Sequence, residues 1–219
     1  MSDSDRPRVR GVVLAGGRST RFGDADKAVA TLEGRPLVAR VVDAVAETTE
    51  RPPILSVATD EQGERLANAL GDRAVEPVRD DPSLSGPLAG VAAAAAATDA
   101  PWLFVCGCDM PLVSPASVGA LRARLAASAD DRAGERGDAD AVVPVVDGYD
   151  QPLHALYRRG AVDDALADRS STDALLTVLD GLAVERVAAD AVAAPLAEAT
   201  TNVNTRADLA ALRGRDSPE

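Results

Sequence analysis

The chain has 219 residues, of which 46% are hydrophobic but only 2% aromatic, and its formal net charge is −12 at pH 7. This length suits one large or two small domains, with a core built mainly from Val, Leu and Ala. The acidic charge argues against nucleic acid as a partner, because a phosphate backbone is bound by a basic face. No signal peptide or membrane-spanning run is recognisable, so we expect a cytoplasmic protein without a membrane partner.

Strand-like and helix-like patterns alternate along the chain. The expected strands are 8–15, 54–58, 74–78, 101–106, 141–146, 153–157 and 184–187. The expected helices are 37–46, 61–70, 86–98, 114–128, 159–168, 172–179 and 206–212. This alternation with short links predicts an α/β fold, a single three-layer Rossmann-like domain with a mostly parallel, doubly wound sheet. The domain would span 8–213, between a disordered tail at 1–7 and a polar tail at 214–219, with a surface loop over 130–140.

The first expected strand runs into a polar loop, residues 16–27, that opens with the adjacent glycines Gly16 and Gly17. Glycines let the backbone approach a ligand closely, and open N–H groups with cations form a cradle for a phosphate chain. The cations are Arg18, Arg21 and Lys27, and Lys27 is the only lysine of the chain. A compact ammonium suits a phosphate on which charge develops. The alternative is an ordinary surface loop, since neither the Walker nor the G-x-G-x-x-G spacing is present.

A candidate metal ligand, Asp109, follows the fourth expected strand. In a doubly wound sheet, ligands bind at the carboxyl ends of the strands where the strand order reverses, and there the first and fourth strands are commonly neighbours. We therefore expect Asp109 to face the glycine loop. A carboxylate beside a polyphosphate is repulsive unless a divalent cation lies between them, which predicts Mg²⁺ on Asp109. The alternative is that Asp109 only caps a turn.

Other polar or small residues permit two interpretations each. The stretch 86–90 could present backbone N–H groups to a ligand, or pack a helix closely on the sheet. His154 is the only histidine and lies among apolar residues, where a packed, hydrogen-bonded histidine is more common than a base. Asn202 and Asn204 flank a turn before the last expected helix, which Thr205 could cap. The two cysteines, at 106 and 108, lack partners for a metal site and are expected to be small buried residues.

At this point the motifs resemble a known family. Leu14-Ala-Gly-Gly-x-Ser-x-Arg-Phe-Gly, Asp26-Lys27, Gly86-Pro-Leu-Ala-Gly90, Cys108-Asp-Met-Pro111, Gln151-Pro-Leu-His-Ala-Leu156 and Asn202-Val-Asn-Thr205 occur in this order. The chain thereby resembles, over nearly its whole length, the molybdenum cofactor guanylyltransferases, which are nucleotidyltransferases with a GT-A-like Rossmann fold. It differs at 206–207, where Arg-Ala stands in place of a common Pro-Glu, and at 57–60, which lacks a common asparagine.

The resemblance implies an enzyme that transfers GMP from GTP to molybdopterin, or to its molybdenum-bearing form, and releases pyrophosphate with the help of Mg²⁺. It implies three sets of site residues. The nucleotide would be bound by Leu14, Ala15, Gly16, Gly17, Arg18, Lys27, Asp80 and Asp109, with Asp81 as an alternative to Asp80. Catalysis would rest on Lys27, Arg21 and the metal ligand Asp109. The pterin substrate would contact His154, Asn202 and Asn204.

Several alternatives stay open. A related enzyme could use CTP in place of GTP, or another phosphorylated small molecule as the acceptor. A module that binds GTP and the pterin without catalysis is a further alternative. Transient contact with other proteins of cofactor biosynthesis, or with molybdoenzymes, is compatible with each of these.

The composition also predicts a response to salt. An excess of Asp, with Arg in place of Lys, resembles proteins of salt-loving organisms. Charge repulsion reaches about 10 Å at 0.1 M salt but only about 3 Å at 1 M, so salt should relax both the self-repulsion of the surface and its repulsion of anionic substrates. We expect the melting temperature and the activity to rise with KCl from 0.1 M into the molar range. A steady loss of both with added salt would contradict this expectation.

Overall fold

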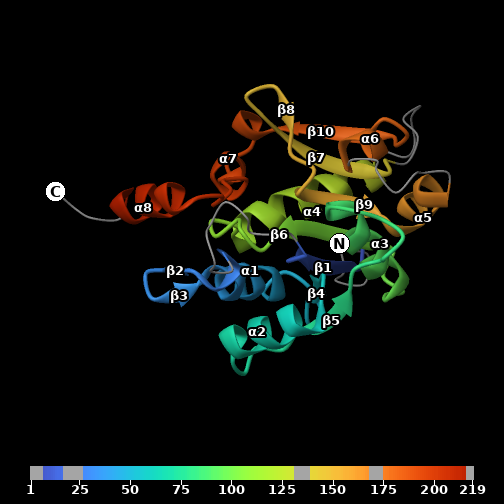
Figure 1. The fold of residues 1–219 in the computed structure, drawn as a ribbon. Coiled ribbons are helices and arrows are strands. Elements are labelled where there is room, and N and C mark those ends of the chain that lie inside the picture. The colour runs from blue at the N-terminus through green and yellow to red at the C-terminus, as the bar shows by residue number, and fades with distance from the viewer. Residues whose placement is uncertain (1–6, 17–26, 131–138, 168–174, 216–219) are drawn as a thin grey trace.

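The computed structural model describes residues 7–16, 27–130, 139–167 and 175–215. Within them, one eight-stranded sheet forms the centre of the molecule, in the order β10-β7-β9-β6-β1-β4-β5 with β8 paired to β7 (Figure 1). The strands are β1 (Val9–Leu14), β4 (Ile54–Val57), β5 (Glu76–Arg79), β6 (Trp102–Gly107), β7 (Ala141–Val146), β8 (Tyr149–Asp150), β9 (His154–Arg158) and β10 (Val184–Ala188). A separate hairpin joins β2 (Thr31–Leu32) to β3 (Arg35–Pro36).

The sheet is mostly parallel, as the sequence predicts. Strand β1 pairs in parallel with β6 on one side and with β4 on the other. The exceptions are β9, which is antiparallel to both of its neighbours, β6 and β7, and the short β8, which is antiparallel to β7. Because β1 and β6 are neighbours, the segments that follow them meet at the same edge of the sheet, which confirms the expected place of Asp109 beside the end of β1.

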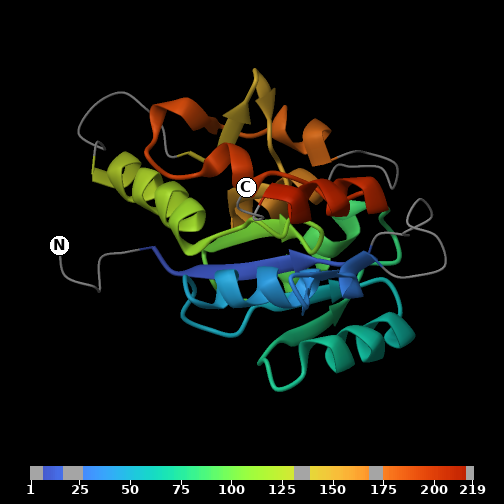
Figure 2. The ribbon, with the colours of Figure 1, turned by 90° about the vertical axis from the view of Figure 1, so that its left-hand side faces the viewer.

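Helices cover both faces of the sheet (Figure 2). One face packs against α1 (Leu37–Ala46), α2 (Asp60–Leu70), α4 (Pro115–Asp130) and α7 (Leu196–Ala199). The other face packs against α3 (Pro87–Ala96), α5 (Arg159–Ala167) and α6 (Leu175–Leu179). Strand β6 is buried along its whole length because it lies between these two layers. The three-layer α/β prediction is therefore confirmed.

The last helix, α8 (Arg206–Arg215), forms a small core of its own with the β2–β3 hairpin. Leu209 and Leu212 pack with Leu32, Leu37 and Val203, and Arg213 donates a hydrogen bond to the carbonyl of Thr31. This contact ties the C-terminal segment to the region that follows the glycine loop. Helix α8 runs two residues past the domain end predicted at 213.

Most expected elements are present, with differences at the short ones. The third strand was predicted over 74–78 but lies at Glu76–Arg79, because its pairing with β4 begins where the Glu76 N–H bonds to the carbonyl of Pro53. The hairpin strands β2, β3 and β8, the 3₁₀ turns η2 (Lys27–Val29) and η3 (Ala189–Ala191), and α7 were not expected. Such elements of two to four residues are too short to show a periodic pattern. Most of the predicted surface loop, 131–138, lies outside the described residues.

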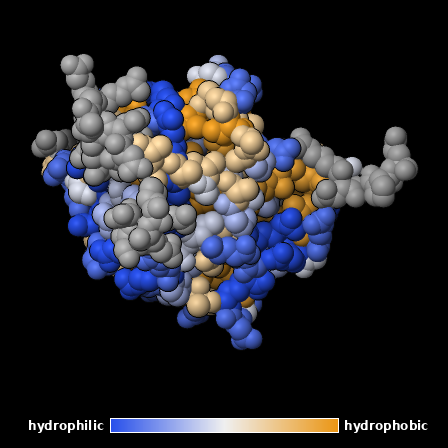
Figure 3. Space-filling view, turned by 180° about the vertical axis from the view of Figure 1, so that it is seen from behind, coloured by the Kyte–Doolittle hydropathy of each residue, from blue (hydrophilic) through white to orange (hydrophobic). Residues whose placement is uncertain are grey.

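Hydrophilic residues cover most of the face seen in Figure 3, with smaller apolar areas between them. Among the residues that the structure describes, no helix combines the length and the apolar character needed to cross a bilayer.

Candidate active site

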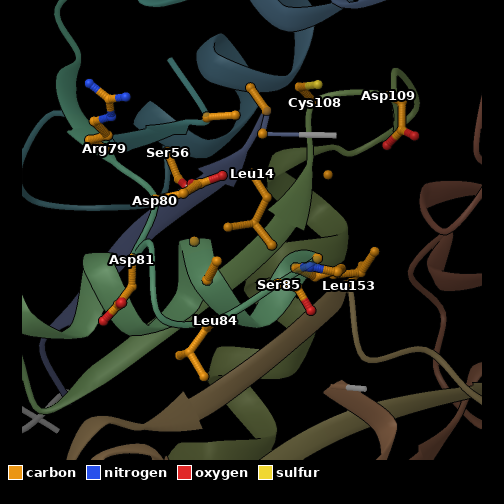
Figure 4. Close-up of a pocket in the computed structure, with 18 of the residues that line it drawn as sticks. Leu14, Ser56, Arg79, Asp80, Asp81, Leu84, Ser85, Cys108, Asp109 and Leu153 are labelled. Atoms are coloured by element: carbon orange, nitrogen blue, oxygen red, sulfur yellow. The ribbon is translucent and has the colours of Figure 1, made fainter. Parts of the chain in front are cut away.

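A cavity of about 520 Å³ opens at the carboxyl ends of β1, β4, β5 and β6, beside the start of α3 (Figure 4). This size is in the range of small-molecule binding sites. Its walls include Leu14 and Ala15 at the end of β1, Gly16 and Lys27 at the two ends of the loop, the stretch 79–82, most of 84–90, and Gly107, Cys108 and Asp109 at the end of β6. Thus all six predicted nucleotide-binding residues that the structure describes line one cavity: Leu14, Ala15, Gly16, Lys27, Asp80 and Asp109.

Asp80 forms one side of this cavity. Its carboxylate accepts a hydrogen bond from the hydroxyl of Ser56 on β4, and Figure 4 shows both side chains beside Leu14. Burial raises the pKa of Asp80, while the bond from Ser56 lowers it. A Cβ at position 16 would lie 1.9 Å from Oδ2 of Asp80, so any residue other than glycine there would displace this carboxylate. The first glycine of the loop therefore serves a close approach to Asp80, while the close approach to a ligand that the sequence suggests stays a prediction.

Asp81, the alternative to Asp80, also lines the cavity but is committed to its own loop. Its Oδ1 accepts hydrogen bonds from the backbone N–H and the hydroxyl of Ser83, at 2.8 and 2.6 Å. These bonds lower the pKa of Asp81. Of the two neighbours, Asp80 is the better placed to receive donors from a ligand, because Asp81 organises the turn.

Lys27, Asp109 and Asn204 meet at the other side of the cavity. The Lys27 ammonium lies 2.5 Å from Oδ2 of Asp109 and 3.3 Å from the side-chain oxygen of Asn204. Lys27 and Asp109 are 19% and 15% exposed, so the pair is shielded but open to a ligand. The structure thus brings together three residues that the sequence separates by up to 177 positions.

The turn that carries Asn204 is held in place by backbone and capping bonds. The Val203 N–H bonds to the carbonyl of Asp109 at 2.8 Å. Asp208 accepts from the N–H groups of Asn204 and Thr205, both at 2.8 Å, while the Thr205 hydroxyl accepts from the Asp208 N–H. This reciprocal cap at the start of α8 is formed without the Pro-Glu pair that the family often has at 206–207. Asn202 bonds to the carbonyl of Thr200 instead of reaching Lys27.

The residues fit a magnesium ion that arrives with a nucleotide. Asp109 offers a carboxylate at the cavity wall, and the described residues contain no group of three or more His, Cys, Asp or Glu side chains that could hold a metal by themselves. Mg²⁺ is commonly bound by one or two carboxylates together with substrate phosphates and waters. These residues therefore suit a metal ion that is bound together with the phosphates of the substrate better than a preformed metal centre.

Some predicted residues are not placed in the cavity. Gly17, Arg18 and Arg21 lie outside the described residues. His154 is fully buried on β9, with its ring edge-on to Phe104 at 5.1 Å between centroids, and it is absent from the cavity lining. This position agrees with the packing expected from its neighbours, but the expected hydrogen bond is wrong, because neither ring nitrogen has a hydrogen-bond partner among the described residues. Its contact with a pterin stays a prediction. Both cysteines are buried, as expected, and the described residues contain no disulfide.

Burial of His154 leads to a prediction on acid stability. Burial lowers its pKa from 6.5 to about 3, so the folded protein keeps the ring neutral while the unfolded chain binds a proton below pH 6.5. Stability is therefore complete above pH 6.5 and falls as the pH drops toward 3, by about 1.4 kcal/mol at pH 5.5. Urea unfolding at pH 7.5 and 5.5 should show this loss in the wild type and not in His154→Leu. An equal loss in both proteins would contradict it, since surface carboxylates are common to both.

Comparison with known proteins places the chain in a family. Residues 11–187 match the model of the MobA-like NTP transferase domain. A "probable molybdenum cofactor guanylyltransferase" of Natronomonas pharaonis is 35% identical over 149 residues, 68% of this chain and 67% of the relative. A protein of the same name from Opitutus terrae is 39% identical over 152 residues, 68% of this chain and 66% of the relative. The matched segments thus span about two thirds of these relatives.

Solved structures show the same fold at lower identity. Molybdopterin-guanine dinucleotide biosynthesis protein A from Archaeoglobus fulgidus has a TM-score of 0.72 and 24% identity, covering 94% of this chain and 97% of the other. A CMP:2-keto-3-deoxy-manno-octonic acid synthetase in complex with CTP has a TM-score of 0.66 and 14% identity, covering 95% and 98%. The GT-A-like nucleotidyltransferase fold expected from the sequence is thereby confirmed.

Proposed function

The chain belongs to the MobA-like NTP transferase family and is a nucleotidyltransferase, and on this premise we propose that it transfers GMP from GTP to molybdopterin or its molybdenum-bearing form. The observation that carries the proposal is the arrangement of charge in the cavity. Asp80 stands at one side and the Lys27–Asp109 pair at the other, with the residues that open the glycine loop between them. A nucleoside triphosphate matches this arrangement, because it has a base with hydrogen-bond donors at one end and a polyanionic chain at the other.

The two sides of the cavity assign an orientation to the nucleotide. The ammonium of Lys27 attracts the triphosphate, while the acceptor Asp80 suits the N–H groups of a base edge. Guanine carries neighbouring N1–H and N2–H₂ donors, which a carboxylate can accept together. Cytosine lacks the ring N–H, so Asp80 supports the choice of GTP over CTP.

The proposed reaction needs no covalent intermediate with the protein. A terminal phosphate oxygen of molybdopterin forms a bond to the α-phosphorus of GTP, and the bond from that phosphorus to the α–β bridging oxygen breaks. Pyrophosphate leaves with the electron pair of the broken bond. Because the nucleophile is already an anion, catalysis consists of positioning and charge neutralisation. Lys27 stabilises the charge that moves onto pyrophosphate, and Arg21 and Arg18 are proposed to assist.

Asp109 would hold Mg²⁺ together with the phosphates, and the ion would neutralise part of their charge when bound. The Lys27 ammonium lies against the same carboxylate, so it holds the Asp109 side chain at the cavity wall. Asn204 fixes Lys27 from the C-terminal turn and stays a candidate, with Asn202 and His154, for the pterin side.

Pyrophosphate release tests the proposal. Purified protein with Mg²⁺, molybdopterin and GTP should release pyrophosphate and form the guanine dinucleotide. Turnover with CTP only would identify a cytidylyltransferase, and turnover with another phosphorylated acceptor only would change the substrate assignment. Binding of GTP and molybdopterin without any pyrophosphate would favour the non-catalytic module.

A further inference from the structure

Gln62 of α2 connects the two strand ends that open the cavity, although it does not line the cavity itself. Its side chain is buried, with 6% of the residue exposed. The amide nitrogen donates to the carbonyl of Ala15 at 2.6 Å, and the amide oxygen accepts from the Ala58 N–H at 2.9 Å. Both hydrogen-bonding groups of one side chain are thus used by the backbone that follows β1 and β4.

This side chain takes the place of a ladder bond. The parallel pairing of β1 with β4 ends where the Ala15 N–H bonds to the carbonyl of Ser56 at 2.9 Å. In an uninterrupted parallel ladder, the next bond would run from the Ala58 N–H to the carbonyl of Ala15. The amide of Gln62 lies between these two groups instead. It therefore satisfies both of them while it holds the strand ends apart.

The same contact sets the direction of the following peptide group. The described residues contain no cis peptide, so the Ala15–Gly16 peptide is trans and its N–H points opposite to its carbonyl. The carbonyl points at Gln62 on α2, and the Gly16 N–H therefore points away from α2. Among the described residues that line the cavity, none belongs to α2.

We propose that Gln62 is a positioning residue for nucleotide binding, which aims the Gly16 N–H at the bound nucleotide through the Ala15 carbonyl. The inference rests on the proposed function, since it assigns a ligand to that N–H. Gln62 is itself fixed at the start of α2, where its backbone N–H bonds to the hydroxyl of the N-cap residue Thr59. The N-terminal end of α2 thus fixes the orientation of the Ala15–Gly16 peptide at the start of the glycine loop.

Calorimetric titration of GTP with Mg²⁺ tests this role in two variants. Gln62→Met keeps a similar size but removes both hydrogen bonds. Gln62→Glu keeps the acceptor for Ala58, and so the anchor of α2, but it can donate to Ala15 only while its carboxyl group is protonated, so its affinity for GTP should fall as the pH is raised. Both variants should bind GTP about tenfold more weakly than the wild type, the effect of losing one well-aimed hydrogen bond.

Leu66→Ala is the matched control. Leu66 is a fully buried residue of the same helix, and its apolar side chain forms no hydrogen bond to Ala15 or Ala58. It should lower the melting temperature but leave the affinity for GTP unchanged below that temperature. Wild-type affinity in Gln62→Met, or an equal loss in Leu66→Ala, would overturn the positioning role alone. A wild-type protein that binds no GTP would overturn the proposed function as well, so the two failures can be told apart.

Discussion

Lys27→Ala should reduce turnover about a hundredfold, equivalent to about 3 kcal/mol of transition-state stabilisation. The ammonium lies against Asp109 and Asn204 at the side of the cavity assigned to the triphosphate. Its removal leaves the leaving pyrophosphate without its preorganised cation. The effect should fall mainly on kcat, because the charge that Lys27 neutralises increases as the bond to the α-phosphorus breaks. Pyrophosphate release at saturating GTP and molybdopterin measures it.

Arg40→Ala provides the control for this prediction. Arg40 also forms an ion pair, with Glu33 at 3.0 Å, but it lies outside the cavity. Its loss should leave turnover nearly unchanged and lower the melting temperature only slightly, since its partner Glu33 is exposed and such ion pairs contribute little. If Lys27→Ala retains wild-type turnover, Lys27 has no part in the reaction.

Gly90→Ala should disrupt the side of the cavity that is assigned to the base. A Cβ at this position of α3 would lie 2.4 Å from the Ser56 hydroxyl, 2.8 Å from Cδ2 of Leu14 and 3.2 Å from Oδ1 of Asp80. These groups come from three different segments and cannot all retreat, because they already pack against one another. We expect about 2 kcal/mol lower stability, as for other overpacked sites, and at least about tenfold weaker GTP binding.

Gly119→Ala is the matched comparison in α4. Nothing lies within 4 Å of a Cβ at position 119, so the substitution only improves helix propensity. It should raise stability by about 0.5–1 kcal/mol and leave GTP binding unchanged. Changes in stability of opposite sign in the two variants would support close packing at Gly90. Equal effects would mean that Asp80 and Ser56 can move freely.

The larger features of this site could be predicted from the sequence. The β1 and β6 segments are apolar runs followed by polar loops, and the topology of doubly wound sheets brings their ends together. Lys27 and Asp109 therefore meet where the sequence places them. Asp80 could be located only by its resemblance to the family pattern, and the structure explains its position through Ser56 and Gly16.

The supporting contacts could not be predicted in the same way. Gln62 lies in a helix whose exposed residues are mostly polar, and nothing in its spacing indicates a bond to Ala15, 47 positions earlier. Asp208 looked like one more acidic residue of a helix, although the spacing of Thr205 and Asp208 is that of a capping pair. Such bonds depend on how elements pack, whereas periodic patterns report only which face of an element is buried.

A crystal structure with Mn²⁺ in place of Mg²⁺ and a GTP analogue that cannot be cleaved between the α- and β-phosphates tests the central claim most directly. The account predicts guanine against Asp80, the triphosphate beside Lys27, and the anomalous signal of Mn²⁺ at Asp109. A base beside Lys27 and phosphates beside Asp80, or a nucleotide bound outside this cavity, would contradict it.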